Sequence, residues 1–315
     1  VTAIFPQGRQ KGTAPVYAGC FTMGGNGEMS GAAFIEERGR FEGPITITNT
    51  HSCGLARDAT VEWLNRQTDV FAKADQPIWL PVAAETYDGK LNDANGHHVQ
   101  REHVFAAFED ARGGPIEEGN VGGGTGMTTY QFKGGSGTAS RLVQIDGKGY
   151  SVGVCVQSNF GKRHLLTVAG IPIGVHYPLE EEPNDDLGSI IGVVATDAPL
   201  MPHQLKRLAR RSALGIARSG GIASNESGDL FLAFSTANEA VIESNFGIAQ
   251  VKMLGEGNLS VIYEAAIQAM DEAIMNALFT GETMTGRDGK TAPGLPVDEV
   301  LDILRRHNRL NPVND

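Results

Sequence analysis

A serine stands at the junction between a loop of small residues and an apolar run. The segment 220–238 reads GGIASNESGDLFLAFSTAN, with Ser227 just before the run Leu230–Phe234. If the peptide bond between Glu226 and Ser227 were broken, the α-amino group of Ser227 would lie within reach of its own hydroxyl. An α-amine has an ordinary pKa of about 8, so it can act as a general base near neutrality. Ser227 is therefore a candidate N-terminal nucleophile.

The same hydroxyl can make the cut. Attack on the Glu226 carbonyl gives an ester by an N-to-O acyl shift, and water then hydrolyses the ester. The alternative is purely structural, with Ser227 and Gly228 in an ordinary turn and Asp229 capping the strand that follows. Local composition alone favours this second interpretation.

A glycine-rich loop supplies a second candidate site. The segment 119–127, GNVGGGTGM, lacks the Gly-Lys-Ser/Thr ending of a phosphate loop and fails the dinucleotide fingerprint at its last position. We expect a loop that passes close to backbone or substrate. Glu117 and Glu118 precede it and Tyr130 follows, so a carboxylate and a phenol could bind a substrate ammonium and an oxyanion. Two solvated glutamates beside a hairpin turn are the alternative.

Other hydrolytic chemistries lack their motifs. The eight histidines form no His-x-x-x-His pair, and no Cys/His cluster predicts a metal site. No Gly-x-Ser-x-Gly elbow predicts an α/β-hydrolase triad. We therefore expect neither a metal nor a cofactor. The three cysteines, an odd number without a Cys-x-x-Cys pair, are expected to be small buried hydrophobes.

Composition indicates a globular protein. The 315 residues are 41% hydrophobic and 20% charged, with a formal net charge of −11. This balance gives no basic footprint for nucleic acid or an anionic membrane surface, and no run approaches the roughly 18 apolar residues of a membrane helix. The chain opens on Val1 with no visible signal peptide, which weakly favours a cytoplasmic location.

Hydrophobic periodicity predicts one α+β domain, 1–315, without repeats. Strands are expected at 1–5, 43–50, 128–132, 142–146, 151–157, 165–168, 190–196, 230–234 and 247–253. Helices are expected at 59–72, 103–111, 198–219 and 259–279, and the segment 297–308 closes the chain. The acidic, proline-containing segment 176–189 is expected to be an exposed loop.

Several long motifs resemble one family of enzymes. They are SGDLFLAFSTAN, VVATDAPLMPHQLKRLARRSALGIAR, EGNVGGGTGM with KGGSGTASR, NTHSCGLARDATVEW, AETYDGKLND and GETMTGRDG. Together they are similar to the self-processing aminopeptidases of the D-aminopeptidase and β-peptidyl aminopeptidase family. The resemblance implies a four-layer αββα sandwich, related to N-terminal-nucleophile hydrolases but with different connectivity. It also implies self-cleavage into chains 1–226 and 227–315, and a homotetramer of such heterodimers.

The resemblance also implies roles for particular residues. Ser227 matches the family's nucleophile, and Glu226–Ser227 matches its processing bond. Tyr130 looks like the tyrosine that stabilises the oxyanion, and Glu118 is the best match for the carboxylate that holds the substrate amine. An asparagine also helps to bind the oxyanion in this family. Asn159 is one candidate for this role, and the polar position Asp197 in VATDAPL, which could also bind substrate, is the other.

A second serine and a glutamate support the nucleophile in this family. Ser260 and Glu264 are the candidates here, although Ser260 could equally cap the helix 259–279 and Glu264 could be a surface charge. The residue before the nucleophile is often small or an asparagine in the family, whereas this chain has Glu226.

The expected function is a serine aminopeptidase that removes N-terminal residues from short peptides, amides or esters after cutting itself. Acyl transfer on a related fold is one alternative, but those relatives typically use threonine as nucleophile. An unprocessed, non-catalytic homologue is the other alternative.

Overall fold

The computed structural model describes residues 1–68, 77–180, 188–238 and 247–310. Its main sheet has six strands in the order β3-β2-β11-β10-β9-β8. Neighbours are antiparallel except β10 and β11, which run parallel. These strands are β2 (Val16–Gly25), β3 (Arg40–Phe41), β8 (Gly135–Ile145), β9 (Lys148–Asn159), β10 (Ser189–Thr196) and β11 (Gly228–Ser235).

A second sheet packs against the first. It has the order β1-β4-β5, with β1 (Thr2–Ile4), β4 (Ile45–Asn49) and β5 (Ala83–Thr86). One apolar cluster joins side chains of both sheets, among them Ile45, Ile47, Ile191, Val193, Leu230 and Leu232. Alternate residues of β10 and β11, such as Ile190 and Phe231, belong instead to the cluster beneath the helices. This burial on both faces explains why the two strands are almost continuously apolar.

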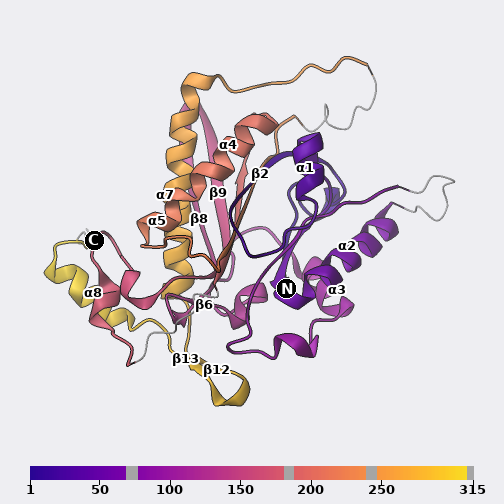
Figure 1. Cartoon of the computed structure of the whole chain (residues 1–315). Helices are drawn as coiled ribbons and strands as arrows, with labels where there is room; N and C mark the ends of the chain where they lie inside the picture. The colour runs from indigo at the N-terminus through magenta and orange to yellow at the C-terminus, as the bar shows by residue number, and fades with distance from the viewer. Residues whose placement is uncertain (69–76, 181–187, 239–246, 311–315) are drawn as a thin grey trace.

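Helices cover both outer faces (Figure 1). On the six-stranded sheet, α4 packs on β2 and β11, α7 packs on β8 and β9, and α5 packs on α7. On the three-stranded sheet, α2 packs on β4 and β5, and α3 on β1. The helices are α1 (Ala32–Arg38), α2 (Cys53–Gln67), α3 (Arg101–Asp110), α4 (Pro202–Ser212), α5 (Leu214–Arg218), α7 (Leu259–Phe279) and α8 (Val297–Arg306).

Three separate apolar clusters therefore fill the spaces between four layers, as the expected αββα sandwich requires. No helix of the described residues is long and apolar enough to cross a membrane. Two small hairpins lie outside the main sheets. They are β6 (Thr128–Thr129) with β7 (Phe132–Lys133), and β12 (Met284–Thr285) with β13 (Thr291–Ala292).

Several expected elements are correct. The helix 259–279 has the predicted bounds, and the strands at 1–5, 43–50, 142–146, 151–157, 190–196 and 230–234 are present with somewhat different ends. The helix expected at 198–219 is broken into α4 and α5. The end of the helix expected at 59–72 and half of the loop 176–189 lie outside the described residues.

Three expected strands are wrong. Residues 128–132 form a hairpin that turns at Tyr130 and Gln131, both with positive φ, of 51° and 61°. Leu165 ends a short 3-10 helix, and residues 247–253 form no strand. β-Branched residues favour extended backbone, but a β-strand also needs a neighbouring strand to pair with. A short run of sequence does not show whether such a neighbour exists. β2 and β5 were not predicted, because the many glycines of β2 and the two alanines of β5 weaken the strand signal.

Lys133 has no exposed surface, and it holds the glycine-rich loop together. Its Nζ donates to the backbone carbonyls of Gly124 at 3.2 Å, Met127 at 2.8 Å and Gly134 at 2.7 Å. Burial lowers the pKa of Lys133 to about 7. Three acceptors match the three donors of an ammonium, which offsets the cost of its burial.

We predict that Lys133→Met destabilises the fold, because buried carbonyls would lose their donor. Each unsatisfied buried group costs about 1–3 kcal/mol, so unfolding should become easier by about 2 kcal/mol or more. Urea unfolding followed by circular dichroism measures this. Lys290→Met, at an exposed position, is the control. Equal stability of the two variants would contradict the assignment.

Candidate active site

Ser227 lies directly before β11 and is buried, with 3% of its surface exposed. Its backbone N–H donates to the carbonyl of Ser224 at 2.9 Å. That bond closes a turn over residues 224–227, so the peptide between Glu226 and Ser227 is part of a tight turn. Ala223, just before the turn, has a φ of 49°, in the left-handed region that non-glycine residues rarely adopt. The junction is thus a constrained connection into a central strand.

The Glu226 carbonyl and the Ser227 hydroxyl each have a side-chain hydrogen-bond partner. Asn26 Nδ2 donates to the carbonyl oxygen of Glu226 at 2.8 Å. The Ser227 hydroxyl donates to Asp229 Oδ1 at 2.7 Å, and Asp229 is itself 1% exposed. The carbonyl that a nucleophile would attack is therefore polarised, and the nearest hydroxyl is hydrogen-bonded to a carboxylate.

Glycines allow these groups to approach one another. A Cβ on Gly228 would lie 2.4 Å from the backbone oxygen of Asn26, and one on Gly24 would lie 2.3 Å from the backbone oxygen of Ser227. A β-bulge accompanies them, since Asp229 pairs with Gly24 whereas Leu230 pairs with Thr22. Bulges redirect side chains next to functional sites. Here the bulge and the glycines bring the loop that follows β2 and contains Asn26, the Asn26 loop, into close contact with the start of β11.

A cavity of about 400 Å³, lined in part by Glu226, opens where the ends of the two sheets meet. Segments following β2, β4 and β5 form it together with the start of β10 and the residue before Ser227. Its lining residues are Asn26, Gly27, Glu28, Thr50, His51, Glu85, Tyr87, Gly188, Ser189 and Glu226. Three of them are glutamates, so the cavity favours a cationic group.

Glu85 is the buried carboxylate of this cavity, with 3% of its surface exposed. It accepts from the Glu28 backbone N–H at 2.8 Å and from the Thr50 hydroxyl. Burial raises the pKa of Glu85, and these two hydrogen bonds oppose that effect. A carboxylate fixed in this way can hold an ammonium group without rearranging.

Tyr130 is fully buried and lies in the left-handed region, an unusual conformation for a bulky residue. Its hydroxyl lies 2.8 Å from the hydroxyl of Ser219, at the start of the loop that leads to Ser227. Arg163 holds the Tyr130 carbonyl at 2.9 Å. Tyr130 therefore anchors one end of this loop.

Asn159 lies close to the cavity but its side-chain amide is engaged on both sides. Its Oδ1 accepts from the Thr128 backbone N–H, and its Nδ2 donates to the carbonyl of Tyr87, each at 2.8 Å. Tyr87 lines the cavity. Asn159 thus positions the wall of the cavity.

Glu118 and Asp197 lie away from Ser227 within one chain. Glu118 accepts from the backbone and hydroxyl of Thr138 on β8, three strands away from β11. Asp197 follows β10 at the end opposite Ser189, the residue that pairs with Gly228. Eight residues of strand span roughly 25 Å. Asp197 there accepts from the Ser151 backbone N–H at 2.7 Å.

Ser260 and Glu264 lie together on α7, and both line a different cavity, of about 390 Å³, beside Arg211 and Arg218. Ser260 does not cap α7, because the helix begins at Leu259 with Asn258 as N-cap. Glu264 accepts from Gln268 on the helix surface at 3.0 Å. The structure thus brings these two residues to each other but not to Ser227.

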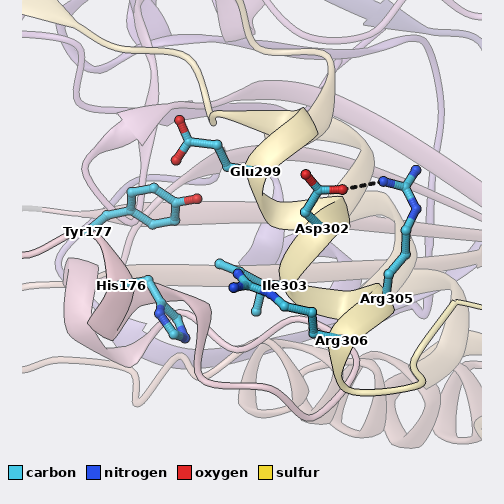
Figure 2. Close-up of a pocket in the computed structure, with 7 residues that line it drawn as sticks. All are labelled: His176, Tyr177, Glu299, Asp302, Ile303, Arg305 and Arg306. Carbon is cyan, nitrogen blue, oxygen red and sulfur yellow. Dashed lines mark hydrogen bonds and ion pairs between the residues drawn. The ribbon is translucent and has the colours of Figure 1, made fainter.

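A further cavity, of about 550 Å³, is elsewhere and contains no predicted site residue. In Figure 2, His176 and Tyr177 line one side of this cavity and residues of α8 line the other. Within α8, Asp302 forms an ion pair with Arg305. Its lining is mostly charged side chains.

Sequence reasoning missed three residues at the Ser227 site. Asn26 stands in GGNGE, a glycine cluster to which no role was assigned, and Glu85 stands in AETYDGKLND, used only for the resemblance. Asp229 was considered only as a cap. Glycines around a single polar residue were the available signal for Asn26, since close backbone approaches need them.

Two other chemistries find no support in the described residues. Burial raises the pKa of each of the three cysteine thiols to about 12, so none is a thiolate near neutral pH. No group of three or more His, Cys, Asp or Glu in the described ranges could hold a metal ion.

The sandwich and a serine at the start of a central strand define an N-terminal-nucleophile type of hydrolase. The sequence profile of peptidase family S58 matches residues 1–292. The chain belongs to this family, and it is a serine aminopeptidase.

Curated relatives agree over nearly the whole chain. The chain is 50% identical to beta-peptidyl aminopeptidase BapA of Sphingosinicella microcystinivorans, covering 98% of this chain and 81% of the relative. It is 40% identical to beta-peptidyl aminopeptidase BapA of Sphingosinicella xenopeptidilytica, covering 97% and 79%.

Solved structures show the same fold. The L-aminopeptidase D-Ala-esterase/amidase of Ochrobactrum anthropi, a prototype serine aminopeptidase with a variant of the Ntn-hydrolase fold, matches with a TM-score of 0.92 and 45% identity. The match covers 98% of this chain and 86% of that one. The beta-aminopeptidase of a Burkholderia species matches with a TM-score of 0.87 and 43% identity, covering 96% and 85%. The expected family and fold are confirmed.

We predict that Gly228→Ala removes most aminopeptidase activity, because its methyl group would displace the Asn26 loop from the start of β11. A shift of about 1 Å at such a site can cost about 100-fold in rate. Gly153→Ala in β9 is the control, since no atom lies within 4 Å of its added Cβ. Hydrolysis of an aminoacyl 4-nitroanilide gives the rates, and equal activity of the two variants would contradict the prediction.

Proposed function

We propose that the chain cuts itself between Glu226 and Ser227, and that Ser227 then serves as the N-terminal nucleophile of the aminopeptidase. One observation carries this proposal. The Glu226 carbonyl accepts a side-chain hydrogen bond from Asn26 while the adjoining hydroxyl of Ser227 is buried and bonded to a carboxylate. An ordinary turn does not require either contact. After the cut, the freed amine of Ser227 can take the proton of its own hydroxyl.

The two reactions share one acyl position. In self-cleavage, Glu226 is the residue whose carbonyl is transferred to Ser227. In aminopeptidase turnover, that place belongs to the N-terminal residue of the substrate. Because Glu226 lines the cavity of about 400 Å³, the same cavity is the binding site for the N-terminal residue of the substrate. Asn26, beside the Glu226 carbonyl, is then placed to contact the substrate carbonyl as well.

Glu85 selects substrates that carry a free amino terminus. The substrate ammonium takes the place of the peptide nitrogen between Asn225 and Glu226, on the cavity side where Glu28 and Glu85 lie. We assign this role to Glu85 rather than to Glu118 because Glu85 lines this cavity, whereas Glu118 accepts from Thr138 on β8.

The substrates we propose are short peptides, amino-acid amides and esters, including those with a β-amino acid at the N-terminus. The relatives named above as beta-peptidyl aminopeptidases support the last group. A panel of aminoacyl 4-nitroanilides in the L, D and β series tests the preference.

We further propose that the processed chains stay together and assemble into a homotetramer of heterodimers. β11 lies between β10 and β2, so the part beginning at Ser227 supplies the middle of the main sheet and cannot leave without breaking it. Light scattering after gel filtration measures the assembly.

We predict that the purified wild-type protein separates into two fragments, 1–226 and 227–315, on a denaturing gel. Ser227→Ala removes the attacking hydroxyl and should leave one full-length band. Mass spectrometry of both samples measures the cut. A wild-type protein that is active while the Glu226–Ser227 bond is intact would contradict the proposal.

We predict that Glu85→Gln raises KM about 10-fold or more with little change in kcat, because the substrate ammonium loses its charged partner. The free energy of unfolding of Glu85→Gln, by contrast, should not fall below that of the wild type. Burial raises the folded-state pKa of Glu85, so ionisation of this group costs stability that is regained as pH falls through that pKa.

The neutral glutamine avoids that cost near pH 7, so its melting temperature should equal or exceed that of the wild type. For the wild type, KM should rise as pH falls and Glu85 becomes protonated. Glu37→Gln, at an exposed position on α1, is the matched control. An unchanged KM in Glu85→Gln would exclude the role of Glu85.

A further inference from the structure

We propose that Asn26 and Asp229 are the catalytic residues of self-cleavage, with Asp229 as the general base and Asn26 as the oxyanion donor. This inference rests on the proposed cut at Glu226–Ser227. Self-cleavage needs a general base, and the base proposed for later turnover is not yet available to it. In the uncut chain the nitrogen of Ser227 is an amide that donates to Ser224, so the α-amine that serves later turnover does not yet exist.

Asp229 is the carboxylate at the nucleophile. Its Oδ1 accepts the proton of the Ser227 hydroxyl at 2.7 Å, which is the distance for direct proton transfer. Asp229 is only 1% exposed, so water competes poorly for this hydrogen bond. Its position is fixed by β11, which pairs Asp229 with Ile190 on one side and Gly24 on the other. The β-bulge follows immediately, between Asp229 and Leu230.

Asn26 is the donor at the carbonyl. Its Nδ2 lies 2.8 Å from the Glu226 oxygen, where negative charge develops on attack. The neighbouring Asn225 does not share this contact, because its Nδ2 donates instead to the side-chain carboxylate of Glu226 at 2.9 Å. The chain thus contains two asparagines near the same bond, of which one contacts the reacting atom.

The step balances without any external reagent except water. As the Ser227 oxygen forms a bond to the Glu226 carbonyl carbon, the hydroxyl proton passes to Asp229, and the carbonyl oxygen becomes an oxyanion held by Asn26. The carbon–nitrogen bond then breaks and the nitrogen takes the proton from Asp229, leaving an ester and a free amine. Water hydrolyses the ester, giving a carboxylate at Glu226 and restoring the Ser227 hydroxyl.

The experiment follows the cut in time. The full chain is made by cell-free translation with a short isotopic pulse, and unprocessed and processed bands are measured during the chase. Asp229→Asn keeps the size of the side chain but cannot accept the proton, so we expect the cut to slow about 100-fold or more. Asn26→Ala should slow it about 10-fold or more. Asn225→Ala should cut at the wild-type rate.

Chemical rescue separates a base from a structural role. Asp229→Ala removes the carboxylate, and added formate can take its place in the space that remains. We expect the rate of cutting in Asp229→Ala to rise with formate concentration, with no such rise in Ser227→Ala. Circular dichroism of each purified variant reports whether it is folded.

The outcomes distinguish the two proposals. If the wild type is never cut, self-cleavage itself is wrong. If the wild type is cut and Ser227→Ala is not, yet Asp229→Asn cuts at the wild-type rate, only the role of Asp229 is overturned. If the Asp229 variants do not fold, the asparagine pair still decides, because equal rates in Asn26→Ala and Asn225→Ala would overturn the arrangement at the carbonyl.

Discussion

The structure depends on the pairing of β11 between β10 and β2. Apolar side chains on both faces of β11 fix its register, since a slip of one residue would turn every side chain to the wrong layer. Gly228 is the first residue of that register, so Ser227 is held at the edge of a fully packed strand. A serine on a free loop would not keep a constant distance to Asn26 and Asp229. The core of the protein therefore determines the geometry of the reactive peptide.

One place in the fold can serve two reactions because both transfer an acyl group to the same hydroxyl. In the mechanism proposed above, the two reactions differ in their base, which is Asp229 before the cut and the α-amine of Ser227 after it. The cavity at the ends of the two sheets accepts the acyl residue in either case. No function is assigned to its glutamates while the chain is intact, but their negative charge complements the positive charge of a free amino terminus. The proposed basis of specificity is thus present in the fold before the proposed cut.

Most of the fold was predictable from the sequence, and most of the site was not. The apolar periodicity of residues 259–279 and the continuous apolar run at 190–196 are local signals, and both elements are present. β2 was missed because its glycines, which weaken a strand pattern, are needed where β2 approaches α4 and the start of β11. Ser227 was found because small residues and an apolar strand flank it. Asn26 and Glu85 lie about 200 and 140 residues before Ser227 in the chain, and only the pairing of strands brings them to it. The roles inferred for Glu118, Asp197, Ser260 and Glu264 from resemblance remain predictions, since within one chain these side chains lie away from the nucleophile.

The position of Glu226 in an acidic cavity has a consequence for what happens once the chain is divided. Before division its backbone carbonyl is a neutral dipole, which Glu28 and Glu85 tolerate. After the proposed cut, the same atom would belong to a terminal carboxylate, and two anionic groups of one residue would face Glu28 and Glu85 on the walls. Their mutual repulsion would drive the new chain end out of the cavity. The proposed maturation step would in this way clear the entrance for substrate without any separate moving part.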